Sequence, residues 1–346
     1  MAIGIALIGS GIFAKEEHLP AIRETPLLEL KAVYSRSLKS AQTLAEGQSL
    51  DLYSDDAEGG KNYDELLKQD DIKAVVIALP ILAQPEYIKK ALSAGKHVLA
   101  EKPIAKDVAT ATELLSWYHS NIKGPTFTIA ENFRFLGSYL YATEQIASLG
   151  RVLGFRTRVS NMVAPGGKYY ETAWRKKPEY QGGFLLDGGV HFIAATRLML
   201  GEAARPVKTS AFTAQLQEHL PPVDTLNATV QLKNGSSGTI ALSFGTTFTG
   251  SEYAFACEKG TVTVTKDRVT VLKAGKDESK DFTEEAERFP YEGNGVKQEI
   301  KAWAESLEKG VMNPRQSPEE ALKDLELLEA MLKSGEQGGA AVELKL

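Results

Sequence analysis

Three short stretches of the sequence carry residue types that can bind phosphate or transfer protons. The first is "GSGIFA" at 9–14, which directly follows an apolar run. The second is "EKP" at 101–103, where a lysine stands between a glutamate and a proline after the run "HVLA". The third is "DGGVH" at 187–191, which sets a carboxylate and an imidazole four positions apart. Each stretch alone also fits an ordinary structural role, so their combination decides the interpretation.

The glycine stretch has the form G-x-G-x-x-A and fits a phosphate-binding turn between a strand and a helix. Gly9 permits the tight turn, Gly11 lets backbone N–H groups approach a pyrophosphate, and Ala14 permits close packing of helix on strand. Because glycines end many strands, a plain turn is the alternative. The position after an N-terminal strand favours dinucleotide binding. The other loop residues expected to contact the cofactor are Ser10, Ile12 and Phe13.

The end of the second apolar run indicates which dinucleotide is bound. An NAD site usually has an acidic residue about 20 residues after the glycines, where it binds the ribose 2′-hydroxyl. The run here ends in Ser35, Arg36 and Ser37, without a carboxylate. A guanidinium between hydroxyl groups suits a 2′-phosphate, because it donates charge-assisted hydrogen bonds to phosphate oxygens. The pattern favours NADP(H) over the alternative of a solvent-exposed arginine at a strand end.

Lys102 follows an apolar run at a position where parallel sheets place their ligands. The carboxyl ends of such strands form the binding edge of a doubly wound sheet. A lysine there can donate a proton to a carbonyl or alkoxide oxygen. Pro103 restricts the backbone of Lys102 to extended conformations. Taken alone, the motif is more typical of a surface lysine.

Asp187 and His191 are spaced to lie on one face of a helical stretch, one turn apart. A carboxylate that orients an imidazole beside a substrate hydroxyl is a recurrent proton-transfer unit. The alternative is an aspartate that caps the helix and a histidine that is satisfied within the core.

The elements around these stretches predict two domains. Near-continuous apolar runs alternate with helical patterns over the first 130 residues, which is typical of a doubly wound α/β domain with a parallel sheet. From residue 151 the strands follow one another through short turns, including an Asn-Gly hairpin signal, which predicts an antiparallel sheet with a few helices. The predicted strands of the first part are 3–9, 28–35, 74–80, 97–101 and 126–132. We therefore expect an α/β domain at 1–125 and an α+β domain at 126–346.

Composition excludes several classes of protein. The chain has 346 residues with a formal net charge of −5, so no basic nucleic-acid-binding surface is indicated. Its one cysteine excludes an internal disulfide and argues against a cysteine-based metal site. No apolar run approaches the roughly 20 residues of a membrane span, and the apolar N-terminus lacks a basic segment before it. We expect a cytoplasmic protein without a metal.

In their order and spacing, G-x-G-x-x-A, E-K-P and W-R followed by G-G-x-x-x-D-G-G-x-H resemble the glucose–fructose oxidoreductase/inositol dehydrogenase (Gfo/Idh/MocA) family over essentially the whole chain. The block at 174–197 resembles the fungal NADP-dependent members. The resemblance implies a Rossmann domain, a second domain with a large open antiparallel sheet, and hydride exchange between nicotinamide C4 and a carbinol or carbonyl carbon. It also implies a homodimer or homotetramer through that sheet.

The resemblance further assigns roles to individual residues. It implies that Lys102 contacts substrate and nicotinamide ribose, while Asp187 and His191 hold and protonate the substrate oxygen. The tract 162–173 is expected beside the substrate, with Tyr170 as the assigned contact, although the pattern does not decide between Tyr169 and Tyr170. The other expected cofactor contacts are Pro80, Glu101, Asn132, Trp174 and Arg175, and the other expected substrate contacts are Phe133 and Arg134.

One loop departs from the family pattern. The loop after the third predicted strand reads "LPILAQPE", with Ile81 and Gln84 where members often carry an asparagine and a histidine. The combined prediction is an NADP(H)-dependent oxidoreductase that acts on a sugar, polyol, cyclitol or related carbonyl compound. A catalytically silent NADP sensor and an enzyme that returns the hydride to substrate within one cycle are the alternatives.

Overall fold

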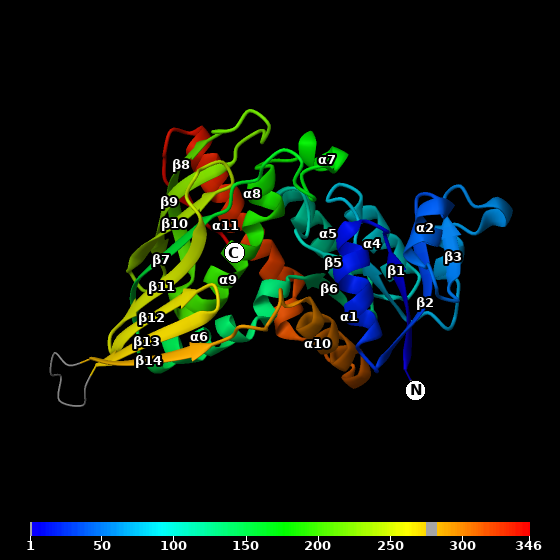
Figure 1. The fold of residues 1–346 in the computed structure, drawn as a ribbon, viewed down its shortest axis with the longest axis horizontal. Helices are drawn as coiled ribbons and strands as arrows, with labels where there is room; N and C mark the ends of the chain where they lie inside the picture. Colours follow the sequence, from blue (N-terminus) through cyan, green and yellow to red (C-terminus); the bar gives the residue numbers. More distant parts are fainter. Residues whose placement is uncertain (1, 275–281) are drawn as a thin grey trace. The chain divides into compact units, whose positions relative to one another are not determined.

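Residues 2–274 and 282–346 are described by a computed structural model, in which the chain forms two units (Figure 1). The first unit comprises Met1–Asn132 and Gly295–Leu322, and the second comprises Phe133–Asn294 and Lys323–Leu346. The sequence-based division after residue 125 placed every later residue in the second domain. The structure differs because the apolar face of a late helix, Val296–Lys309, packs into the core of the first unit.

The first unit is built on a six-stranded parallel sheet. Its strands are β1 (Ile3–Ile8), β2 (Leu28–Ser35), β3 (Asp51–Ser54), β4 (Ala74–Ile77), β5 (His97–Glu101) and β6 (Phe127–Ala130). The strand order is β3–β2–β1–β4–β5–β6, and all pairs are parallel. The order reverses between β1 and β4, where doubly wound sheets bind ligands at the carboxyl ends of their strands. The predicted α/β domain is confirmed.

Helices pack against this sheet, and two of them come from the late segment Gly295–Leu322 (Figure 1). The apolar side chains at 5–8 of β1 and 74–77 of β4 are fully buried, as expected for strands covered on both faces. The helical elements are η1 (Ala14–His18), α1 (Leu19–Arg23), α2 (Leu38–Leu44), η2 (Glu58–Gly60), α3 (Tyr63–Leu67), α4 (Gln84–Ser93), α5 (Val108–Asn121), α10 (Val296–Lys309) and η5 (Pro314–Gln316). Helix α10 packs against α1 and η1.

The second unit is built on a nine-stranded sheet that is antiparallel except for one pair. Its strands are β7 (Val152–Ser160), β8 (Pro206–Ala214), β9 (Thr225–Leu232), β10 (Ser237–Ser243), β11 (Gly250–Cys257), β12 (Gly260–Thr265), β13 (Arg268–Ala274), β14 (Phe282–Arg288) and β15 (Val342–Glu343). The order is β14–β13–β12–β11–β7–β10–β9–β8–β15, with β7 and β10 parallel. The predicted α+β domain with a large, mainly antiparallel sheet is confirmed.

Helices of the second unit lie on one face of this sheet (Figure 1). They are α6 (Gly137–Ser148), α7 (Ala173–Lys176), α8 (Phe184–Asp187), α9 (Gly189–Leu200) and the short η4 (Glu202–Ala204). Helix α6 packs on β12 and β13, and α9 packs on β7. Two elements, η3 (Asn132–Phe135) and α11 (Pro318–Glu336), contribute residues to both units. Within the described ranges, no helix combines the length and apolar character needed to cross a membrane.

Candidate functional site

The glycine loop after β1 has the geometry of a phosphate-binding turn. Gly9 has a φ of +110°, and a Cβ added there would lie 2.3 Å from the carbonyl oxygen of Ala78. Only glycine fits this position, because any side chain would meet the backbone that follows β4. A Cβ on Gly11 would meet no heavy atom within 4 Å, so there is open space beside this exposed residue. Ile12 and Phe13 are half-buried and lead into η1.

The ends of β1 and β2 meet through a hydroxyl pair. Ser10 Oγ and Ser35 Oγ are 2.7 Å apart, and Ser37 Oγ accepts a 3.3 Å hydrogen bond from the Ser40 amide at the start of α2. Arg36, between the two serines, is exposed. The residues present therefore fit a dinucleotide: the glycines leave room for a pyrophosphate, and the serine–arginine run offers donors to a ribose substituent.

A carboxylate that the sequence pattern did not indicate lies beside this run. Asp56 Oδ1 accepts a 2.6 Å hydrogen bond from the Leu38 amide and a 2.7 Å hydrogen bond from Ser54 Oγ. These hydrogen bonds hold the pKa of Asp56 below its usual value, so the group is an anion at neutral pH. Asp56 follows β3, a strand that was not predicted from the sequence. Its carboxylate oxygen is hydrogen-bonded to groups of the protein.

The E-K-P stretch closes β5 with a carboxylate that has two partners. Glu101 Oε1 lies 2.6 Å from His18 Nε2, and Glu101 Oε2 accepts a 3.2 Å hydrogen bond from the Lys102 amide. The Lys102 side chain is half-buried, and the Lys102–Pro103 peptide bond is cis. In the loop after β4, Pro80 is half-buried and Ile81 is buried. Gln84 in α4 is also buried, and its amide has no hydrogen-bond partner among the described residues.

A second carboxyl group, Glu299, is enclosed in the first unit. It lies on the apolar face of α10 and is fully buried, with neither oxygen hydrogen-bonded within the described part of the chain. Burial raises the pKa of Glu299 well above its usual value, and the nearby carboxyl groups of Glu101 and Glu131 raise it further. Glu299 is therefore held as the neutral acid. An acid within the apolar stripe at 296–304 was the available sequence signal.

Replacing Glu299 with glutamine is expected to flatten the pH dependence of stability. Above the unfolded-state pKa of about 4.3 and below the raised native pKa, only the folded protein binds this proton. The free energy of unfolding therefore falls as pH rises through that window, by up to about 1.4 kcal/mol per pH unit from this group. The glutamine variant loses that decline in urea unfolding measured at several pH values. Glu308→Gln, on the exposed side of α10, is the control, and equal pH slopes in all three proteins would contradict the assignment.

The carboxylate of the third motif is held by the arginine of the W-R pair. Asp187 ends α8 and is buried, and its Oδ2 and Oδ1 accept hydrogen bonds of 2.5 and 3.4 Å from Arg175 Nε and Nη2. The Arg175 guanidinium also lies 4.0 Å from the ring centroid of Trp174. Burial, and then the charge of Asp187, raise the pKa of the neighbouring Tyr180. The predicted pairing of Asp187 with His191 remains a prediction.

His191 lies on α9 against an aromatic surface. Its ring stacks on Phe133, with centroids 4.6 Å apart and planes 19° from parallel. Phe133 belongs to the "NFRF" segment, in which Asn132 is buried. The structure therefore brings together two predicted substrate-binding residues, His191 and Phe133, and the stack fixes the plane of the imidazole.

In the tract before W-R, one of the two tyrosines packs against other side chains of the protein and the other is exposed. Tyr170 is half-buried and packs against Phe184, at 6.4 Å between centroids, and edge-on to His219 at 5.4 Å. Tyr169 is exposed, with the Arg175 guanidinium 5.4 Å from its ring centroid. The structure thus selects Tyr170 as the inward-facing residue of the pair.

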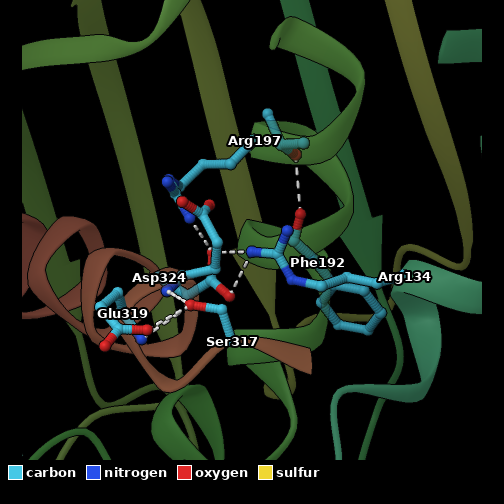
Figure 2. Close-up of polar contacts among 8 residues, drawn as sticks. Arg134, Phe192, Arg197, Ser317, Glu319 and Asp324 are labelled. Carbon is cyan, nitrogen blue, oxygen red and sulfur yellow. Dashed lines mark hydrogen bonds and ion pairs between the residues drawn. The ribbon is translucent and has the colours of Figure 1, made fainter. Parts of the chain in front are cut away.

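Arg134, a predicted substrate contact, takes part in a buried ion-pair cluster of the second unit (Figure 2). Its Nη2 lies 2.7 Å from each carboxylate oxygen of Asp324, and Arg197 Nη1 also donates to Asp324 Oδ1. The side chains of Arg134 and Asp324 are 4% and 1% exposed. The cluster joins η3, α9 and α11, and no short-range sequence pattern indicated it.

Comparison with known proteins gives matches over nearly the whole chain. A model of an oxidoreductase family's NAD-binding Rossmann fold matches residues 3–122, and a model of that family's C-terminal alpha/beta domain matches residues 143–344. A dehydrogenase of Fusarium mangiferae is 44% identical over 344 residues, which cover 98% of each protein.

Two solved structures have a fold similar to that of this chain. The crystal structure of an oxidoreductase from Thermotoga maritima has a TM-score of 0.86 at 31% identity and covers 99% of this chain and 98% of its own. A 3-ketoreductase from Actinomadura kijaniata, solved in complex with NADP and TDP-benzene, has a TM-score of 0.77 at 24% identity. The latter alignment covers 96% of this chain and 98% of that one, and at this identity it shows the fold.

Proposed function

The chain belongs to the Gfo/Idh/MocA family of oxidoreductases, and on that premise we propose that it is an NADP(H)-dependent enzyme of carbonyl reduction or carbinol oxidation. Its substrate is a sugar, polyol, cyclitol or related carbonyl compound. The observation that carries the proposal is that the glycine loop, the Ser-Arg-Ser run and Lys102 all leave one edge of the parallel sheet, after β1, β2 and β5. The NADP complex of the Actinomadura ketoreductase supports the choice of cofactor.

The residues divide the work of binding and proton transfer. When bound, the cofactor supplies or accepts a hydride at nicotinamide C4. In the reduction direction, Lys102 or His191 supplies the proton to the substrate oxygen, and the same group takes it back in oxidation. Asp187 holds the substrate hydroxyl, with its own position fixed by Arg175. The Phe133 stack keeps the His191 ring in one plane for that transfer.

Arg36→Ala is expected to raise the KM for NADPH about 10- to 100-fold, the worth of a charge-assisted hydrogen bond to a phosphate. The KM for NADH should stay within about twofold, because NADH carries a 2′-hydroxyl and no phosphate there. Steady-state kinetics with both cofactors measures the difference, and Lys39→Ala on α2 removes a nearby exposed cation as control. Equal losses with the two cofactors would show that Arg36 does not select NADP, and would leave Asp56 as the group to examine next.

A panel of aldehydes, aldoses and polyols tests the proposal directly. The proposal expects at least one compound to change the nicotinamide absorbance with NADP(H), and far more slowly with NAD(H). Tight NADP binding without turnover of any compound would favour a sensor instead. Product formation from a substrate without net change in bound NADP would favour an enzyme that returns its hydride within each cycle.

The nine-stranded sheet is the proposed surface for a homodimer or homotetramer. On its central strands β11, β7 and β10, the side chains of Ala254, Arg156 and Thr239 lie in register on the face opposite the buried residues. This broad face of small and polar side chains is accessible in the single chain and suits a self-complementary contact. We expect Thr239→Asp to shift the mass measured by light scattering towards the monomer, and Thr229→Asp, in register with it on the same face of β9, should do the same. A wild-type monomer would contradict the proposal.

A further inference from the structure

His18 is a fully buried histidine whose ring makes a polar contact with the carboxyl group of Glu101. Its Nε2 lies 2.6 Å from Glu101 Oε1, and the His18 side chain has no solvent exposure. Its second ring nitrogen, Nδ1, is buried and meets no hydrogen-bond partner among the residues that the structure describes. Burying a polar ring costs free energy unless its hydrogen bonds are made. The contact with Glu101 therefore offsets part of the cost of burying His18.

The carboxyl group of Glu101 contacts the next residue as well as His18. While Oε1 faces His18, Oε2 accepts the hydrogen bond from the backbone amide of Lys102. One carboxylate, 12% exposed, therefore bridges an imidazole and the backbone that carries the proposed proton donor. Because both oxygens are engaged, neither the carboxylate nor the Lys102 amide can rotate away without losing a charge-assisted hydrogen bond.

The other end of this connection is the glycine loop. His18 closes η1, the helical turn that begins directly after the loop at 9–13. The Phe13 ring packs edge-on to the His18 ring, with centroids 5.3 Å apart and planes at 76°. The imidazole thus ties the segment that we propose for phosphate binding to the end of β5.

Two other carboxyl groups belong to the same cluster. Glu299 on α10 and Glu131 after β6 are the other carboxyl groups whose charges act within this cluster. Neither oxygen of Glu299 has a hydrogen-bond partner among the described residues, so the polar contact of the imidazole there is with Glu101. A partly satisfied buried network of this kind is expensive to maintain, which argues for a role beyond packing.

We propose that His18 is a positioning residue for Lys102, acting through the Glu101 carboxylate. The inference rests on the proposed function, because it assumes that Lys102 serves the chemical step. The competing explanation is purely structural: His18 pins η1 onto β5, and Lys102 would keep its geometry without it. The two explanations differ in whether loss of His18 alters Lys102 itself.

The test compares His18→Phe, which keeps a ring but removes its hydrogen bond, with His18→Gln, which keeps a donor. We expect His18→Phe to lower kcat about 10- to 100-fold, the cost of a displacement of about 1 Å at a reacting group. The KM for NADPH should change less than threefold or so, and His18→Gln should recover most of kcat. His119→Phe, an exposed histidine on α5, is the matched control and should keep full activity.

A double-variant cycle separates positioning from folding. In a Lys102→Met background, His18→Phe should cause no further loss of kcat, because a residue that acts through Lys102 has nothing left to position. Independent, multiplicative losses in the double variant would overturn the proposal. So would a His18→Phe protein that is less stable yet has the kcat of the wild type.

One readout does not depend on turnover. The rate at which an amine-selective reagent labels Lys102, followed by mass spectrometry, should change in His18→Phe and return in His18→Gln. If no carbonyl compound is turned over but this labelling change appears, the proposed function fails while the positioning inference stands. An unchanged labelling rate together with an unchanged kcat would overturn the inference alone.

Discussion

Replacing Lys102 with methionine is expected to lower kcat for carbonyl reduction by about 10²- to 10⁴-fold, the usual contribution of a positioned proton donor. Methionine keeps an unbranched side chain of similar length but carries no proton and no charge. The backbone hydrogen bond from residue 102 to Glu101 Oε2 is retained, since it comes from the amide. Because the glycine loop and the Ser-Arg-Ser run are untouched, the dissociation constant for NADPH should change by less than about threefold.

The measurement pairs steady-state kinetics with NADPH binding followed by fluorescence. Lys106→Met is the matched control, because this exposed lysine is four residues further along and comes after β5 has ended. If Lys102→Met kept the wild-type kcat with a working substrate, the assignment of Lys102 would be wrong. A rise in both dissociation constant and KM with normal kcat would instead make Lys102 a binding residue.

The parallel sheet could be predicted from sequence because its strands are buried on both faces. Near-continuous apolar runs at 3–9, 74–80 and 97–101 correspond to β1, β4 and β5, with ends that differ by at most three residues. Strand β3 was missed, since "DLYS" is short and half polar and lies at the sheet edge. Helix α10 shows what one sequence leaves open about domain boundaries, because its apolar stripe predicts burial but not the partner that buries it.

The candidate site also contains residues that the sequence indicated and contacts that only the structure shows. Sequence spacing singled out Gly9, Lys102 and Asp187 as candidates, because each stands at a fixed offset from a strand or helix end, and their roles stay predictions. The contacts that orient them join positions far apart in the chain, such as His18 with Glu101 and Arg134 with Asp324. Such pairs depend on tertiary packing, and one sequence contains no local pattern for them. The family resemblance predicted that Trp174 and Arg175 contact the cofactor. The structure shows in addition that Arg175 donates a hydrogen bond to Asp187.

Asp324 is expected to be a highly sensitive position for stability outside the proposed catalytic residues. Its carboxylate, 1% exposed, receives both Arg134 and Arg197 within the second unit (Figure 2). Asp324→Ala removes the negative charge and leaves two largely buried guanidinium groups without it. Breaking a buried ion pair from one side typically costs about 3–5 kcal/mol, so we expect a loss of that size in the free energy of unfolding in urea.

Removing the whole cluster should cost less than removing its centre. The triple variant Arg134→Met, Arg197→Met, Asp324→Leu replaces all three charges with apolar side chains of comparable size, and such replacements are often close to neutral. It should therefore be more stable than Asp324→Ala, although it carries two further substitutions. Glu336→Ala, exposed at the end of α11, is the control and should change stability by less than about 0.5 kcal/mol. If Asp324→Ala cost less than about 1 kcal/mol, or the triple variant cost more than the single one, the two arginines would not depend on this carboxylate, and Arg134 would again be available for the substrate contact expected from the family resemblance.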